Sequence, residues 1–184
     1  MMKQSSKNII LVALLALAIT LRLLPHIPNF VPITAIALFA GVYFGGAWAY
    51  ILPLMAMIIT DIFLGFHSTM FFVYGSLVLT VGIGHLVRMK KNPLTILAGT
   101  LAGSILFFII TNFGVWTTTK WYAADLSGLL KCYEMAIPFF RNSLAGDLFY
   151  VTIFFGAYES AVLVIKKQKV RRQFGREGVN GKEF

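Results

Sequence analysis

Long apolar stretches, separated by short polar or Pro- and Gly-containing segments, dominate the pattern of this chain. A bilayer's hydrocarbon core of about 30 Å is crossed by roughly 17 to 25 helical residues, so a stretch of that length predicts a membrane-spanning helix. We therefore expect an all-α integral membrane protein with about six transmembrane helices. The predicted spans are residues 8–24, 32–45, 47–66, 69–87, 94–115 and 146–165.

Proline and glycine mark where several of these stretches end. Pro25 and Pro28 follow the first stretch, and proline disfavours a continued helix. Gly45 and Gly46 supply a tight turn before the third stretch. The second stretch, 32–45, is short for a complete crossing, so it is predicted to be tilted or partly re-entrant.

The composition supports lipid rather than water as the surrounding medium. The chain has 184 residues, of which 58% are hydrophobic and 12% charged, whereas a soluble domain carries about 25% charged residues. The polar residues are too few to cover a water-facing surface. We expect one transmembrane domain, residues 1–165, followed by a basic cytoplasmic tail, residues 166–184.

The Lys and Arg residues predict the orientation, because positively charged short loops stay in the cytoplasm. With six spans and a cytoplasmic N-terminus, twelve of the 16 basic residues lie inside and four outside. Without the span at 32–45, the basic cluster at 88–91 would lie outside. The charge pattern thus favours six crossings with both termini cytoplasmic. The basic residues are expected to contact anionic lipid headgroups, and no motif typical of nucleic-acid binding is present.

Five polar or ionisable residues are predicted near the outer ends of the spans: Arg22, Asp61, His67, Asn112 and Asp147. Ionisable groups inside a bilayer need a partner or a water-filled cavity. One interpretation is that they pair to hold helix ends together, with Arg22 and Asp61 as the preferred pair. The other is that they line an outward-facing cavity for a polar or anionic small molecule. The two interpretations are compatible.

The segment between Asn112 and Asp147 is predicted to be a long outer loop, and long loops are usually functional. Apolar residues at spacings of three and four from Leu126 to Ile137 predict an amphipathic helix at the outer interface. Pro138 is expected to end that helix. The segment is interpreted as a lid over the cavity, and Phe30, Trp116 and Tyr133 are predicted to enclose the ligand.

The candidate substrate-binding residues share a predicted position at the outer side: Arg22, Asn29, Phe30, Asp61, His67, Asn112, Trp116, Cys132, Tyr133, Arg141, Asn142 and Asp147. Cys132 is interpreted chiefly as a packed residue, with coordination of a soft metal centre in a bound cofactor left open. No catalytic set, metal-ligand spacing or phosphate-binding glycine loop is recognisable. We therefore predict no enzyme activity and no cofactor, and any ATP hydrolysis falls to a partner protein.

Four segments carry a resemblance to a known group of proteins: 22–30 (RLLPHIPNF), 61–67 (DIFLGFH), 111–116 (TNFGVW) and 132–142 (CYEMAIPFFRN), the last followed by Gly146 and Asp147. They resemble an uncharacterised family of small bacterial membrane proteins that is grouped with the substrate-binding S components of energy-coupling factor (ECF) transporters.

This resemblance implies a six-helix protein of the bacterial cytoplasmic membrane that captures a vitamin-like micronutrient from outside. It also implies association with a transmembrane coupling subunit and two ATPases. S components often meet that subunit through an Ala-x-x-x-Ala pattern in the first helix, but Ala13, Ala16 and Ala18 do not have this spacing. Docking on a shared module and independent action both stay open. The alternative functions are a structural or assembly protein without a ligand and an intramembrane enzyme.

Overall fold

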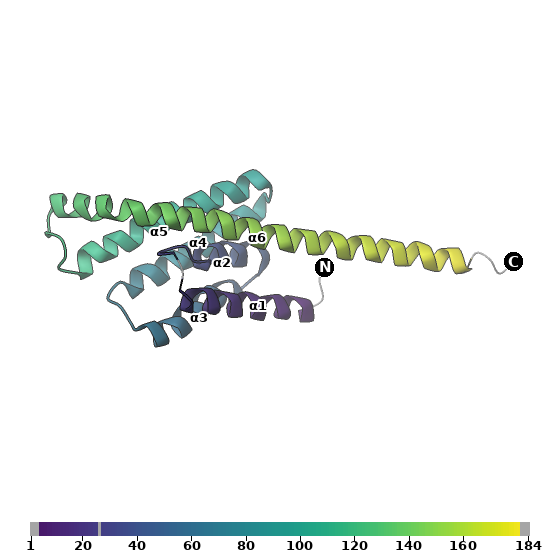
Figure 1. The fold of residues 1–184 in the computed structure, drawn as a ribbon. Helices are drawn as coiled ribbons and strands as arrows, with labels where there is room; N and C mark the ends of the chain where they lie inside the picture. The colour runs from purple at the N-terminus through teal and green to yellow at the C-terminus, as the bar shows by residue number, and fades with distance from the viewer. Residues whose placement is uncertain (1–3, 26, 181–184) are drawn as a thin grey trace. The chain divides into compact units, whose positions relative to one another are not determined.

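The computed structural model describes residues 4–25 and 27–180, and it is all-helical over that range (Figure 1). Its six helices agree in number with the six predicted apolar stretches. In chain order they are α1 (Gln4–Leu23), α2 (Ile33–Tyr43), α3 (Trp48–Leu64), α4 (Met70–Met89), α5 (Pro93–Thr118) and α6 (Leu126–Asn180). The chain divides into two compact units, Met1–Val151 and Thr152–Phe184.

Helix α2 is the centre of the first unit. It packs against α3, α4 and α5, and Ile36, Leu38 and Phe39 are at most 1% exposed. A helix that is apolar on all sides is one that proteins bury, and nearly every residue of α2 is apolar. With 11 residues, α2 is about 16 Å long at 1.5 Å per residue. That length is short of a full bilayer core, as the sequence predicted.

Glycines bring the backbones of α2 and α4 into direct contact. A Cβ atom built on Gly41 would lie 2.3 Å from the carbonyl oxygen of Val81 and 2.9 Å from Cα of Gly84. A Cβ atom on Gly84 would meet the Leu38 carbonyl oxygen at 2.5 Å. No side chain fits at either position, so these glycines set the spacing between the two helices.

Gly99 and Gly103 of α5 have the four-residue spacing that permits close helix approach. The neighbour is α4 of the same chain. A Cβ atom on Gly99 would lie 2.5 Å from Cγ2 of Val87, and one on Gly103 would lie 3.2 Å from Cγ2 of Thr80. The small residues therefore serve packing within the monomer.

The predicted helix boundary after the basic cluster at 88–91 is confirmed. Helix α4 ends at Met89, and α5 begins with Pro93 at its first position. The Asn92 side chain accepts a hydrogen bond from the Thr95 amide, while the Thr95 hydroxyl accepts one from the Asn92 amide. This capping box and the N1 proline explain why α5 starts there.

A helix over the predicted amphipathic stretch from Leu126 to Ile137 is confirmed, but the predicted long loop and the predicted helix end at Pro138 are wrong. Only residues 119–125 connect α5 to α6, and α6 continues through Pro138 and the predicted sixth span to Asn180. Proline removes one backbone donor but already has helical φ, and the turns on either side of it in α6 keep their helical hydrogen bonding. The basic tail is helical to Asn180, and residues 181–184 lie outside the described residues.

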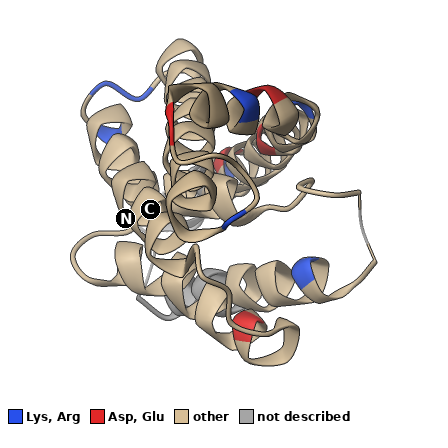
Figure 2. Cartoon of the chain, turned by 90° about the vertical axis from the view of Figure 1, so that its left-hand side faces the viewer, with Lys and Arg blue, Asp and Glu red and all other residues tan. Residues whose placement is uncertain are grey.

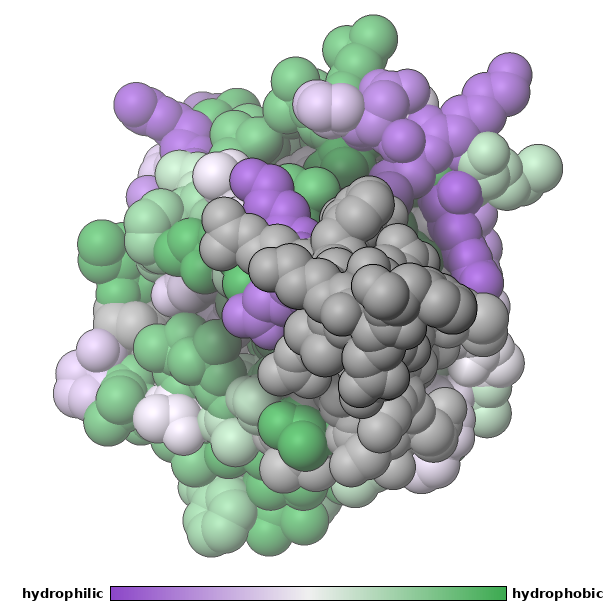
Figure 3. All heavy atoms as spheres, turned by 90° about the vertical axis from the view of Figure 1, so that its right-hand side faces the viewer, coloured by the Kyte–Doolittle hydropathy of each residue, from purple (hydrophilic) through white to green (hydrophobic). Residues whose placement is uncertain are grey.

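Within the part of the chain that the structure describes, three helical segments are long and apolar enough to cross a membrane: Met70–Met89, Pro93–Thr118 and Leu126–Ile165. On the first two, Phe71, Leu86 and Leu94 are at least 68% exposed. Charged residues are sparse along the helices in Figure 2. Hydrophobic residues cover the lower and left parts of the face in Figure 3, while hydrophilic residues gather in its upper part. Large exposed apolar surfaces of this kind suit contact with lipid.

Candidate functional site

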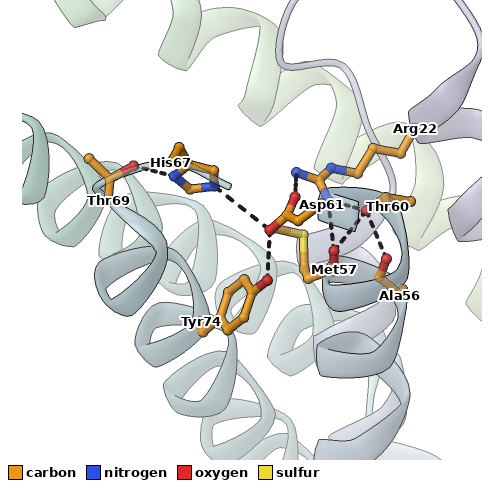
Figure 4. Close-up of polar contacts among 8 residues, drawn as sticks. All are labelled: Arg22, Ala56, Met57, Thr60, Asp61, His67, Thr69 and Tyr74. Carbon is orange, nitrogen blue, oxygen red and sulfur yellow. Dashed lines mark hydrogen bonds and ion pairs between the residues drawn. The ribbon is translucent and has the colours of Figure 1, made fainter. Parts of the chain in front are cut away.

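An ion pair joins the end of α1 to α3. Nη2 of Arg22 lies 2.7 Å from Oδ1 of Asp61, and the two side chains are 16% and 1% exposed (Figure 4). The predicted pairing of these two residues is confirmed. A carboxylate this deeply buried needs a cation beside it, and Arg22 provides one at contact distance.

The second oxygen of Asp61 is also engaged. The Tyr74 hydroxyl donates a hydrogen bond of 2.6 Å to Oδ2, and Nε2 of His67 lies 3.8 Å from the same atom (Figure 4). Nδ1 of His67 is 2.8 Å from the Thr69 hydroxyl oxygen. The carboxylate thus connects α3 to α4 and to the short segment between them.

Arg22 is held by further contacts with α3. Its Nη1 donates to the Thr60 hydroxyl oxygen and to the Met57 carbonyl oxygen, the latter at 3.3 Å. The Thr60 hydroxyl itself donates to backbone carbonyls one turn earlier. The guanidinium is therefore fixed in orientation as well as neutralised in charge.

Beside this network lies a cavity of about 470 Å³, within the range of about 300 to 1,000 Å³ that is usual for small-molecule sites. Its walls are mainly apolar and aromatic, and among the described residues lining it Arg22 is the one Lys, Arg, Asp or Glu side chain. Polar lining comes from amides, hydroxyls and an imidazole. The lining includes Arg22, Asn29, Thr34, His67, Ser104, Phe107, Phe108, Thr111, Asn112, Trp121, Tyr122, Cys132, Met135, Ala136, Phe139, Phe140 and Ser143.

Five of the predicted site residues line this cavity: Arg22, Asn29, His67, Asn112 and Cys132. The Cys132 thiol is buried and donates toward the Asn112 carbonyl oxygen at 3.4 Å. The Asn112 side chain donates to a carbonyl in its own helix. These contacts place Cys132 at the α5–α6 contact as a packed residue that also touches the cavity.

The three aromatic residues that were predicted to enclose the ligand lie elsewhere. Phe30 packs against Phe149 and Tyr150, with ring centroids 5.7 and 5.5 Å away. The Trp116 indole donates to the Ala123 carbonyl oxygen, and the Tyr133 hydroxyl donates to a carbonyl of α5. All three make contacts around the cavity and are not among the residues that line it.

The other predicted residues do not border the cavity either. Asp61 forms the ion pair with Arg22 and does not itself line the cavity, and Arg141 is exposed. The Asn142 side chain donates to the Pro28 carbonyl oxygen at 3.1 Å, which ties α6 to the segment before α2. Asp147 is buried and accepts a hydrogen bond of 2.6 Å from the Ser104 hydroxyl.

The sequence-based prediction missed most of the cavity wall. Phe107 and Phe108 of α5 and Phe139 and Phe140 of α6 line it, and the ring centroids of Phe108 and Phe140 are 4.6 Å apart. Adjacent Phe-Phe pairs in two helices are a visible signal, but one shared with lipid-facing surfaces. Trp121, in the segment that joins α5 to α6, also lines the cavity.

The groups that line the cavity determine what chemistry it offers. Within residues 4–25 and 27–180, no group of three His, Cys, Asp or Glu side chains is placed to hold a metal ion. The cavity offers aromatic surface, the Asn29 and Asn112 amides and the neutralised guanidinium of Arg22. These groups can enclose and orient a mainly apolar molecule with a few hydrogen-bonding groups.

Comparison with known proteins places the chain in a family without assigning it an activity. No curated protein and no solved structure matches it significantly. A family model does match, over residues 2–171, which is nearly the whole chain. The chain therefore belongs to a family of unknown function, DUF6580.

Proposed function

We propose that this protein is the substrate-binding membrane component of an uptake system for a small, vitamin-like micronutrient. The observation that carries the proposal is the cavity of about 470 Å³, walled by aromatic and aliphatic side chains with a few polar groups. Such a combination is typical of sites that enclose an organic molecule. The resemblance to ECF S components, which capture micronutrients, agrees with it.

The charge balance of the cavity limits the class of ligand that it favours. Arg22 is already paired with Asp61 at 2.7 Å, so the site offers little net positive charge to an anion. A strongly anionic ligand would have to displace Asp61, which is 1% exposed and also bonded to Tyr74. The favoured ligand is therefore largely apolar and close to neutral, with a ring system that the phenylalanine side chains can contact.

The position of the cavity along the helices favours capture from outside. Val73, near the start of α4, lines the cavity. The basic cluster at 88–91 lies at the opposite end of that 20-residue helix. If the basic cluster is cytoplasmic, the cavity lies toward the outer face. The proposed topology is therefore a multi-pass protein of the bacterial cytoplasmic membrane with both termini in the cytoplasm.

A coupling subunit and ATPases are the partners that the ECF resemblance suggests. Their contribution would be the energy for release into the cell, since the sequence contains no ATP-binding loop of the Walker type. A protein that binds the ligand and works alone is the alternative within the same function.

Native mass spectrometry of the gently purified full chain tests the proposal. We expect a reproducible small-molecule mass on the wild-type protein. Ala136→Phe should remove it, because Ala136 is 8% exposed and lines the cavity. Ala145→Phe is the matched control in the same helix, since Ala145 is exposed and does not line the cavity.

An empty wild-type protein from cells grown in rich medium would contradict the proposal. In that case the polar groups around Asp61 serve packing alone, and a structural or assembly role becomes the better interpretation. Retention of the small molecule by Ala136→Phe would instead show that it binds outside this cavity. Copurifying ATPase subunits would establish the shared-module form of the function.

A further inference from the structure

A second buried carboxyl group, Asp147, lies in α6 away from the Arg22–Asp61 pair. It is 3% exposed, and Oδ2 accepts a hydrogen bond of 2.6 Å from the Ser104 hydroxyl of α5. The Ser104 oxygen is also 3.0 Å from the Thr100 carbonyl oxygen. The contact between Ser104 and Asp147 therefore lies at the packed interface of α5 and α6.

Among the described residues that border the same small gap as Asp147, none carries a charge that could balance a carboxylate. The described residues that share its small space come from α2, α4, α5 and α6, and none of them is ionisable: Thr34, Ala35, Leu38, Thr80, Gly99, Thr100, Gly103 and Val151. Asp61 by contrast has Arg22 at 2.7 Å. A buried carboxylate without a cation is strongly unfavourable, so this group either takes up a proton or binds another cation.

The available space favours the proton. The gap bordered by these residues and Asp147 is too small to hold a water molecule. The hydroxyls of Thr80 and Thr100 donate within their own helices, to the carbonyls of Ser76 and Ile96. A metal cation would need room and several oxygen ligands turned toward it, whereas a proton needs neither.

Ser104 connects this buried group to the cavity, because it lines the cavity and donates to Asp147. We propose that Asp147 is a proton-binding site inside the helical unit, loaded through Ser104. In loading, the Ser104 hydroxyl gives its proton to the Asp147 carboxylate while it receives one from protonated water in the cavity. The hydroxyl is restored, the carboxylate becomes a neutral carboxylic acid, and one proton has moved inward.

This site is independent of what the cavity binds. It requires water at the cavity wall and the hydrogen bond to Asp147, and it requires no ligand. A protein with no small-molecule ligand could therefore still hold this proton, and a ligand-binding protein could lack it.

Infrared spectroscopy of the full chain in lipid nanodiscs tests the proposal, because a protonated carboxylic acid has a carbonyl band separate from the backbone amide band. At neutral pH we expect this band in the wild type and its loss in Asp147→Asn. The band should persist in Asp125→Asn, which changes an exposed carboxylate that caps α6 by accepting from the Gly128 amide. Absence of the band in the wild type, or its persistence in Asp147→Asn, would overturn the assignment.

Ser104→Ala provides a second measurement that does not depend on Asp147→Asn folding. Loss of the hydrogen bond should shift the frequency of the acid band while the band itself stays. After transfer to heavy water, the isotope shift of the band should develop more slowly in Ser104→Ala than in the wild type. An unshifted band with unchanged exchange would refute the role of Ser104 as the route.

Discussion

Within the first unit, the helices are close together at one end and are held apart by side chains at the other. At the closely packed end, defined by Gly41, Gly84, Gly99 and Gly103, the helix backbones approach until a single Cβ atom would not fit at several positions. At the cavity end, which comprises the first turns of α4 and the later turns of α5, large side chains and a polar network lie between the helices.

This difference shows how one helical unit can be both tightly packed and hollow. Glycines remove side-chain volume, so the backbones of α2 and α4 touch and side chains of α4 lie directly against the α5 backbone. Bulky rings do the opposite, as at the Phe108–Phe140 contact. The rings of α5 and α6 border a cavity of about 470 Å³ that they do not fill.

The two buried carboxyl groups follow the same division. Asp61 at the cavity end is 1% exposed and has a cation, while Asp147 is 3% exposed, beside the glycines of α5, and has a serine. Burial is nearly equal, so the neighbours decide the charge state. The first has its charge balanced by Arg22, and the second is expected to be neutral.

The largest effect is expected from breaking the ion pair at the cavity end. Arg22→Met should lower the free energy of unfolding by about 3 to 5 kcal/mol, because Asp61 would stay buried without its cation. The double variant Arg22→Met with Asp61→Asn should recover most of this loss. Unfolding in mixed detergent micelles measures both, and equal losses in the single and double variants would show that the charge pairing is not the cause.

A smaller effect is expected at the closely packed end. Gly84→Ala should cost about 1 to 3 kcal/mol in the same unfolding measurement, because the added methyl would lie 2.5 Å from the Leu38 carbonyl oxygen. Gly82→Ala is the matched control two residues earlier in α4, with nothing within 4 Å of its built Cβ. The control should be neutral or stabilising by up to about 1 kcal/mol, as for glycine to alanine inside a helix. Similar costs at both positions would argue against backbone contact between α2 and α4.

The smallest effect is expected at Ser104. Ser104→Ala should cost about 0.5 to 1.5 kcal/mol if its partner Asp147 is a neutral acid. A hydrogen bond to an ionised group is worth about 1.5 to 3 kcal/mol, so a loss in that range would indicate a carboxylate. The unfolding free energy therefore distinguishes the two states of Asp147 without spectroscopy.

Local signals in the sequence located most of the helices. The proline after the basic cluster at 88–91 marks the start of α5, and the paired glycines Gly45 and Gly46 precede α3. The pairing of Arg22 with Asp61 also followed from the sequence, because a carboxylate inside an apolar helix requires a partner and Arg22 was available at the same predicted depth.

Local signals failed where competing stabilisation is spread over a whole helix. Pro138 suggested a break, yet α6 runs through it, because one lost backbone bond is outweighed by continuous helical turns on both sides. The segment predicted to be a lid therefore forms the first turns of α6. Helix propensity describes a single residue, whereas whether a helix continues depends on the stability of the whole segment.

The sequence by itself determined that the chain is helical, where five of the six helices begin, and that Asp61 would find a cation. Only the tertiary structure decided which side chains line the cavity, that Tyr74 completes the Asp61 network, and that Asp147 meets Ser104 rather than a basic residue. Those contacts join residues far apart in the chain, so they depend on the rotation and spacing of whole helices. Backbone contacts at Gly41 and Gly84 set that spacing, and no local pattern encodes it.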